Sequence, residues 1–278
     1  MIRVKNWIKN FLIFIPFIFS AKFLDFDKVE YFTMFLGFFI FCFSSSIIYI
    51  INDIMDIEKD KLDEKKCHRP IASGCISIKN AIITVIILAI IVVSGLLYLN
   101  SFPILGITVI YIVFNILYSF KFKNIPIWDI TLLSLFFLIR IFYGGVLLNI
   151  PVSIYLYLTT LSAAFYFGIT KRKKELENNK NVRKVLQEYP AEYLNNSTTL
   201  FLGLTIVYYS LWVINYTGII NRLVLDISIV LVIVILLWYN LIISKNKNGN
   251  PTDVLLENKT LIFMVLLYCF VMFIGFFI

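Results

Sequence analysis

The chain has 278 residues, of which 60% are hydrophobic and 15% charged, and its formal net charge is +8. A water-soluble domain contains about 25% charged residues, so this composition excludes a soluble globular fold. The positive charge does not indicate nucleic-acid binding, because the Lys and Arg residues lie in the gaps between apolar runs. The sequence therefore predicts an all-α, polytopic membrane helix bundle.

Uncharged runs long enough to cross a hydrocarbon core about 30 Å thick follow one another with short connections. Dividing the chain at charged or turn-forming breaks predicts about nine transmembrane helices in a single domain over residues 1–278. The predicted helices are residues 8–24, 30–52, 79–99, 103–121, 128–148, 151–170, 195–217, 223–244 and 259–277. The first run is expected to be a retained helix rather than a removed signal peptide, since no convincing small-residue cleavage site follows it.

The basic residues divide unequally between the two sides of this bundle. With a cytoplasmic N-terminus, one side collects all but four of the 25 Lys and Arg residues. The four exceptions are Lys22, Lys28, Arg222 and the intramembrane Arg140. We therefore expect a protein of the cytoplasmic membrane with its N-terminus inside and its C-terminus outside. The polar loops on the cytoplasmic side are residues 53–78, 121–127, 171–194 and 245–258. A site built from loops should face the cytoplasm.

The first polar loop opens with three aspartates, Asp53, Asp56 and Asp60, where the second predicted helix leaves the membrane. Spacings of three and four residues place them on one helical face. Mg²⁺ commonly combines one or two carboxylates with substrate phosphates, so the pattern suits a metal-bridged diphosphate. A solvated acidic helix end, mixed with Glu58 and Lys59, is the alternative that the spacing alone leaves open.

Basic residues follow the aspartates closely, in the stretch from Lys65 to Gly74. Carboxylates for a metal and cations for phosphate oxygens are what diphosphate chemistry requires. The combined pattern, NDxxDxxxD from Asn52 and KxxRPIASG from Lys66, resembles the first aspartate-rich motif of the UbiA superfamily of membrane prenyltransferases. The resemblance implies a UbiA-like bundle and a magnesium-dependent transferase.

The second cytoplasmic loop indicates a branch of that superfamily. Aromatic prenyltransferases usually carry several aspartates there, whereas this chain has Asp129 with Lys121 and Lys123. The loop looks like that of decaprenyl-phosphate phosphoribosyltransferases, which move 5-phosphoribose from phosphoribosyl diphosphate onto a polyprenyl phosphate. Further similar stretches are Arg3-x-x-x-Trp7-x-Lys9-Asn10, Lys171-Arg172-x-x-Glu175-Leu176, Arg183-Lys184 with Tyr193-Leu194, and Gly249-Asn250-Pro251 to Thr260. The donor and the acceptor of this reaction both carry phosphate groups, and the Lys and Arg residues of these loops supply the positive charge to bind them.

The fifth predicted helix contains two unusual features. Arg140 lies within the membrane, where a charged side chain costs at least about 2.5 kcal/mol on insertion scales. We expect it to face the interior, paired with a carboxylate or orienting the phosphate of the acceptor lipid. Gly144 and Gly145 are expected to permit close packing rather than to cradle phosphate.

These patterns assign roles to individual residues. Asp53, Asp56 and Asp60 are expected to be catalytic and to hold Mg²⁺. The expected substrate-binding residues are Asn52, Lys9, Lys66, Arg69, Tyr118, Lys123, Asp129, Arg140, Lys171 and Arg172. The implied partners are phosphoribosyl diphosphate, a polyprenyl phosphate lipid and the bilayer, without nucleic acid and with a homo-oligomer left open. The implied pathway is cell-envelope biosynthesis.

Two other functions remain open. A UbiA-type prenyltransferase would use the same aspartates, with a polyprenyl diphosphate as the donor and an aromatic or other acceptor. A non-catalytic lipid or anion transporter is the second alternative. It is disfavoured because intramembrane charge usually marks a transport path, and Arg140 is the one candidate for such a charge.

Overall fold

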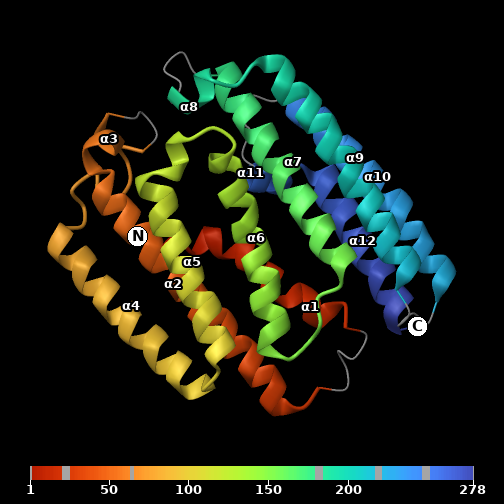
Figure 1. The fold of residues 1–278 in the computed structure, drawn as a ribbon, viewed down its shortest axis with the longest axis horizontal. Helices are drawn as coiled ribbons and strands as arrows, with labels where there is room; N and C mark the ends of the chain where they lie inside the picture. The colour runs from red at the N-terminus through yellow and green to blue at the C-terminus, as the bar shows by residue number, and fades with distance from the viewer. Residues whose placement is uncertain are drawn as a thin grey trace. The chain divides into compact units, whose positions relative to one another are not determined.

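The computed structural model describes residues 2–20, 26–62, 66–178, 184–216, 221–245 and 251–277. The described residues form helices and connecting segments without a β-strand, which confirms the all-α prediction. The chain divides into two compact units, and Figure 1 labels the helices of both. Unit 1 comprises Met1–Lys121 and Ile139–Pro151, and unit 2 comprises Phe122–Leu138 and Val152–Ile278.

Unit 1 is built around one long helix. Its elements are the 3₁₀ helix η1 (Val4–Phe14), α1 (Ile15–Ile18), α2 (Lys28–Met55), α3 (Ile57–Lys61), α4 (Ile78–Leu99), α5 (Phe102–Phe120) and the second half of α6 (Trp128–Leu147). A capping box starts α2, because Asp27 and Glu30 each accept a hydrogen bond from the other's backbone N–H. Ser77 caps α4, and Asn100 ends it in the left-handed conformation.

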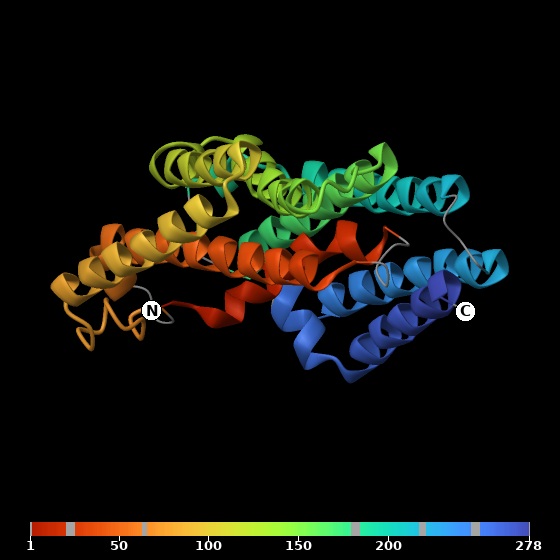
Figure 2. The same ribbon diagram turned by 90° about the horizontal axis from the view of Figure 1, so that it is seen from below.

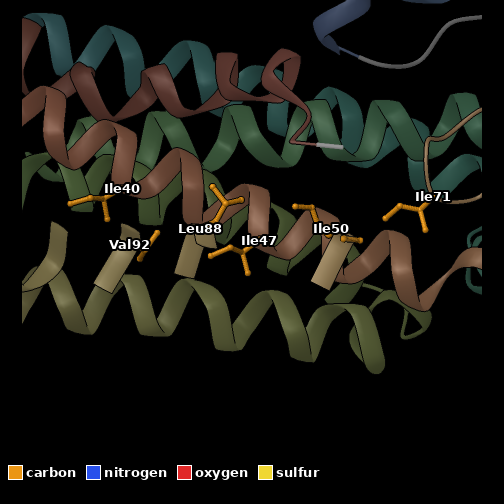
Figure 3. Packing of buried hydrophobic residues seen from close by; sticks show 7 residues of the cluster. Ile40, Ile47, Ile50, Ile71, Leu88 and Val92 are labelled. Atoms are coloured by element: carbon orange, nitrogen blue, oxygen red, sulfur yellow. The ribbon is translucent and has the colours of Figure 1, made fainter. Parts of the chain in front are cut away.

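The core of unit 1 lies along the contact between α2 and α4. In its most apolar stretch α2 is 67% buried, whereas α4 is 11% buried, so α2 is the central helix. Ile40 and Ile50 of α2 belong to the same buried cluster as Leu88 and Val92 of α4 (Figure 3). Ile71, from the loop after α3, joins the row beyond Ile50 (Figure 3). This contact anchors the loop that carries the predicted phosphate-binding arginine.

The N-terminal segment differs from the predicted helix over residues 8–24. It forms η1 followed by the short α1, and residues 21–25 lie outside the described part of the chain. The segment packs on α2 (red in Figures 1 and 2). The Trp7 indole donates to Ser46 Oγ at 3.1 Å, and the Asn10 amide donates to Ser45 Oγ at 3.3 Å. These contacts with α2 hold the segment in a conformation that its own apolar pattern does not indicate.

Gly144 of α6 allows the same segment to approach closely. A Cβ atom at this position would lie 1.9 Å from the backbone carbonyl oxygen of Ile13. The expectation that Gly144 permits close packing is therefore confirmed, and the partner is the N-terminal segment.

Unit 2 packs its helices in pairs. Its elements are η2 (Phe122–Asn124), the first half of α6, α7 (Ile154–Asn178), α8 (Lys184–Gln187), α9 (Ala191–Asn215), α10 (Arg222–Lys245), α11 (Pro251–Glu257) and α12 (Lys259–Phe277). α7 packs on α9, and α10 packs on α9 and α12. Figure 2 shows α12 returning beside α10 after the short α11. Among the predicted features, Arg183, Gly249 and Asn250 lie outside the described residues.

Within the described residues, seven helices are long and apolar enough to cross a membrane, namely α2, α4, α5, α6, α9, α10 and α12. The predicted number of nine is not confirmed. The first apolar run forms η1, and α7, although 25 residues long, is too polar to be counted. α4 presents exposed Ile82, Ile86 and Ile90, which suit contact with lipid. The chain is an integral membrane protein.

Candidate active site

Two of the three motif aspartates are buried where α2 gives way to α3. The side chains of Asp53 and Asp60 are each only 4% exposed. The predicted continuous helical face is interrupted, because α2 ends at Met55 and Asp56 separates it from α3. The Asp56 side chain is 29% exposed, and its carboxylate lies 3.8 Å from Lys59 Nζ. The structure thus groups Asp53 with Asp60 and leaves Asp56 nearer the surface.

One arginine joins the two buried carboxylates. Arg69 Nη1 donates to Asp60 Oδ2 at 2.5 Å and to Asp53 Oδ1 at 3.2 Å. Arg3 also donates to Asp53 Oδ1, and its guanidinium lies over the ring of Tyr49. Both arginine side chains are roughly one-quarter exposed, so this network reaches the surface. The network offers acidic oxygens and guanidinium groups side by side.

The sequence around Arg69 explains how it is held. Ile71 and Ala72 are buried, and Ile71 joins the α2–α4 core. The Ser73 N–H donates to the Arg69 carbonyl at 2.8 Å, and Gly74 has φ +77°, a conformation that favours glycine. The apolar part of the RPIASG stretch therefore anchors a turn that directs Arg69 towards the aspartates.

The donor set of this cluster suits a magnesium ion that is completed by substrate. In the described part of the chain, no group of three or more His, Cys, Asp and Glu side chains is arranged to hold a metal ion. Mg²⁺ does not require such a group, because it commonly binds one or two carboxylates together with substrate phosphates and waters. Asp53 and Asp60 provide two carboxylates near cations that can meet phosphate.

The other predicted residues of unit 1 lie in half-buried positions. Lys9 is on η1, Asn52 is in the last turn of α2, Lys66 is in the loop before Arg69, and Tyr118 is near the end of α5. Arg3 was not among the predicted site residues. Its signal was present in the Arg3-x-x-x-Trp7 stretch, but its contact with Asp53 spans 50 positions in sequence.

Arg140 lies in the interior of unit 1, as predicted. Its Nε donates to Asn10 Oδ1 at 2.8 Å, and its Nη2 donates to the Tyr111 hydroxyl at 3.3 Å. The guanidinium also lies 5.4 Å from the ring centres of Phe41 and Tyr111. The groups named here, on Asn10, Tyr111 and Phe41, are uncharged. These contacts connect the N-terminal segment to α5 and α6.

Unit 2 contains a second acidic group, Asp129, at the start of α6. Asp129 is fully buried, and its Oδ2 accepts a hydrogen bond from Arg172 Nε at 2.9 Å. Arg172 Nη1 donates to Glu175 Oε2 at 2.7 Å. The Tyr189 hydroxyl donates to Asp129 Oδ1 at 2.6 Å and accepts from the Ile127 N–H at 2.5 Å. The structure thus pairs two predicted substrate-binding residues, Asp129 and Arg172, with each other.

The backbone before α6 is strained to make this arrangement. Ile127 has φ +69°, which is unusual for a β-branched residue and costs on the order of 1–3 kcal/mol. In this conformation its N–H reaches the Tyr189 hydroxyl. Burial, together with the neighbouring Asp129 carboxylate, raises the pKa of Tyr189 above its usual range. The phenol therefore stays protonated and acts as the donor to Asp129.

The predicted lysines of unit 2 are more accessible than Arg172. Lys171 is 40% exposed and lies 4.0 Å from Glu175, whereas the Arg172 side chain is 4% exposed. Lys123 is half-buried on η2. Of the neighbouring pair, Lys171 is therefore the better placed to meet a phosphate.

Replacing Tyr189 with Phe tests the hydroxyl that contacts Asp129. We expect the free energy of unfolding to fall by about 1–3 kcal/mol, because a buried carboxylate loses a donor. The measurement is unfolding in mixed micelles titrated with dodecyl sulfate. Tyr193→Phe is the matched control, since Tyr193 is an exposed tyrosine stacked on Tyr189. Equal losses in the two variants would contradict the role of the Tyr189 hydroxyl.

The fold and these clusters define a helical membrane protein with buried carboxylates at its helix ends. A model of the UbiA prenyltransferase family matches residues 12–267. The chain belongs to this family and is a transferase, as the motif predicted.

Curated relatives and solved structures agree with this membership. The decaprenyl-phosphate phosphoribosyltransferase of Mycolicibacterium smegmatis is 27% identical, over 94% of this chain and 86% of its own. The Corynebacterium glutamicum protein of the same name is 27% identical, over 98% and 84%. A UbiA homolog from Archaeoglobus fulgidus bound to GPP and Mg²⁺ has a TM-score of 0.70 at 19% identity, covering 98% of this chain and 96% of that one. A structure from work on digeranylgeranylglyceryl phosphate synthase has a TM-score of 0.68 at 24% identity, covering 99% and 96%. The structural likenesses show the shared fold.

Proposed function

We propose that the protein transfers 5-phosphoribose from phosphoribosyl diphosphate to a polyprenyl phosphate, with Mg²⁺ as cofactor and diphosphate as the leaving group. The observation that carries this proposal is the pair of buried carboxylates, Asp53 and Asp60, bridged by Arg69. The two curated relatives named decaprenyl-phosphate phosphoribosyltransferase, similar over nearly the whole chain, support the choice of donor.

Asp53 and Asp60 would hold the metal ion, with Asp56 and Asn52 as neighbouring oxygen donors. Bound Mg²⁺ would neutralise the charge that develops on the departing diphosphate. A UbiA homolog of the same fold, from Archaeoglobus fulgidus, is bound to GPP and Mg²⁺, which supports Mg²⁺ as the cofactor. Arg69 is placed to exchange a carboxylate oxygen for a phosphate oxygen, since its side chain is partly exposed.

In the transfer, the bond between ribose C1 and the diphosphate oxygen breaks, and diphosphate leaves with the electron pair. An oxygen of the lipid phosphate forms the new bond to C1. The acceptor is already an anion, so no general base is needed. Lys9, Lys66 and Arg69 of unit 1 would bind phosphate oxygens. The assignment of Lys123 and Lys171 to phosphate binding stays a prediction from the sequence. Tyr118 would donate a hydrogen bond.

The contacts of three predicted substrate-binding residues lead us to assign them structural roles. Asp129 and Arg172 are engaged with each other, so we assign them to positioning the start of α6 and the end of α7. Arg140 holds the N-terminal segment through Asn10. The sequence predicts that Arg140 orients the acceptor phosphate. In that role, Arg140 would release Asn10 and donate its hydrogen bond to the lipid phosphate.

The proposed orientation places the N-terminus and the acidic cluster on the cytoplasmic side and the C-terminus outside. The uneven division of Lys and Arg residues supports it. Phosphoribosyl diphosphate, a soluble and highly charged donor, would then reach the site from the cytoplasm of a cell whose cytoplasmic membrane holds the enzyme.

The test is an assay with purified full-length protein, phosphoribosyl diphosphate labelled in the ribose, and a polyprenyl phosphate in detergent or liposomes. We expect a labelled lipid that forms with Mg²⁺ and not with excess chelator. Lipid phosphate omitted from one reaction controls for hydrolysis of the donor. Absence of the labelled lipid under these conditions would contradict the proposal.

A second candidate is a prenyltransferase with a polyprenyl diphosphate donor. Membership of the UbiA prenyltransferase family favours it. The same preparation, given a labelled polyprenyl diphosphate and an aromatic acceptor, would then form product while the phosphoribosyl donor gave none. The transporter alternative lacks comparable support, because the family is one of transferases.

A further inference from the structure

The N-terminal segment, Ile2–Ile18, brings a cation onto the proposed metal ligand. Arg3 donates to Asp53 Oδ1, the same oxygen that accepts a hydrogen bond from Arg69. Arg3 itself adopts φ +53°, in the left-handed region, immediately before η1 begins at Val4. A single carboxylate oxygen is therefore shared by two guanidinium groups from distant parts of unit 1.

The rest of the segment is fastened to unit 1 beyond Arg3. Ser46 Oγ accepts from the Trp7 indole and donates to the Ile2 carbonyl at 3.0 Å. The buried Arg140 fixes Asn10 at 2.8 Å. Further along, the Ile13 carbonyl lies directly against Gly144. These attachments hold the segment that carries Arg3 against α2 and α6.

A metal ion bound to the carboxylates would affect Arg3 and Arg69 differently. In the described contacts, the guanidinium groups of Arg3 and Arg69 balance the carboxylates of Asp53 and Asp60. A divalent cation added to the same oxygens would repel both guanidinium groups. Arg69 contacts both Asp53 and Asp60, whereas Arg3 contacts Asp53. Because Arg3 holds fewer carboxylates and is partly exposed, its guanidinium can turn to a new partner while the backbone of the segment stays attached.

We propose that Arg3 is a displaceable cation of the acidic pair. In the metal-free protein it binds Asp53, and when magnesium and the donor arrive it passes from the carboxylate to an oxygen of the diphosphate. The proposal rests on the magnesium–diphosphate site proposed above and adds a coupling to it. Without the donor, Arg3 competes with the metal ion for Asp53. With the donor present, Arg3 can bind the diphosphate instead, so the protein binds the metal ion more tightly when the donor is bound.

Binding of Mn²⁺ alone, followed by electron paramagnetic resonance on the full-length protein without donor, tests this. We expect Arg3→Ala to tighten Mn²⁺ binding about tenfold, because a charged hydrogen bond no longer competes for Asp53. Lys5→Ala is the control, since Lys5 is exposed on the same segment and its loss removes the same charge. Unchanged or weaker binding by Arg3→Ala, or equal tightening by Lys5→Ala, would overturn the proposal.

Gly144→Ala tests the same idea with Arg3 intact. The added Cβ would displace the segment at Ile13, so we expect faster trypsin cleavage after Lys5 and Lys9 together with tighter Mn²⁺ binding. Faster cleavage with unchanged Mn²⁺ affinity would overturn the proposal. The assay contains no donor, so its result is independent of which diphosphate the enzyme uses. If neither wild type nor variants bind Mn²⁺, the metal site itself fails, and the Arg3 proposal fails with it.

Discussion

Replacing Asp53 with Asn is expected to lower the rate of transfer at least about a hundredfold while the protein remains folded. The amide keeps the size of the carboxylate and one acceptor oxygen, but it removes the charge that would hold Mg²⁺. Arg3 and Arg69 are partly exposed, so water can solvate them when their partner is neutral. The rate is measured with saturating donor and acceptor across a range of Mg²⁺ concentrations, and folding is monitored by thermal denaturation in detergent.

The neighbouring carboxylates provide graded comparisons for this experiment. Asp60→Asn should be as damaging as Asp53→Asn, because both side chains are buried and contact Arg69. Asp56→Asn should be less damaging, since the Asp56 side chain is more exposed than those of Asp53 and Asp60. Glu58→Gln is the control, because Glu58 is an exposed carboxylate paired with Lys61 on the same short helix. Loss of activity in Glu58→Gln equal to that in Asp53→Asn would contradict a specific metal role.

Features that depend on neighbouring residues could be predicted from the sequence. The second predicted helix, 30–52, corresponds closely to α2, because its apolar run and the cap at Asp27 are local signals. The acidic and basic parts of the first loop were also predicted to act together, and Arg69 does contact Asp53 and Asp60. The sequence separations in this cluster are short enough for the motif itself to indicate the contact.

Features that depend on distant contacts could not be predicted. The apolar run over 8–24 resembles a membrane helix, but hydrogen bonds from Trp7 and Asn10 to α2 hold it as a 3₁₀ segment. The contact between Asp129 and Tyr189 joins residues 60 positions apart. The residues next to Asp129 in the sequence do not reveal that Tyr189 contacts it. The sequence therefore predicted Asp129 as a site residue but could not predict which side chains surround it.

The sequence at the end of α7 contains charge pairs that favour a helix, but its high overall charge led to the prediction of a loop. Residues 171–194 were expected to form a loop because they are highly charged. Instead α7 continues to Asn178, and Arg172–Glu175 and Lys174–Glu177 pair at a spacing of three residues along the helix. Opposite charges at this spacing favour a helix, so the charge pattern is compatible with helix as well as with loop.

The pair formed by Asp129 and Arg172 leads to the prediction with the largest effect on stability. Replacing either residue alone, Asp129→Asn or Arg172→Gln, is expected to lower the free energy of unfolding by about 3–5 kcal/mol, because a buried ion pair loses one of its two charges. Lys171→Gln is the matched control. It removes the same charge from the adjacent position, but Lys171 is 40% exposed, so the loss should stay below about 1 kcal/mol.

The double variant separates a structural pair from two independent binding residues. With both charges removed, no buried charge is left unpaired, so much of the lost stability should return in the titration with dodecyl sulfate. Glu175 does not prevent this recovery, because its side chain reaches solvent and can be hydrated after Arg172 is replaced. If the losses in the two single variants simply add in the double variant, then Asp129 and Arg172 do not stabilise the protein as a pair. Arg172 would in that case stay a candidate for phosphate binding, as the sequence predicts.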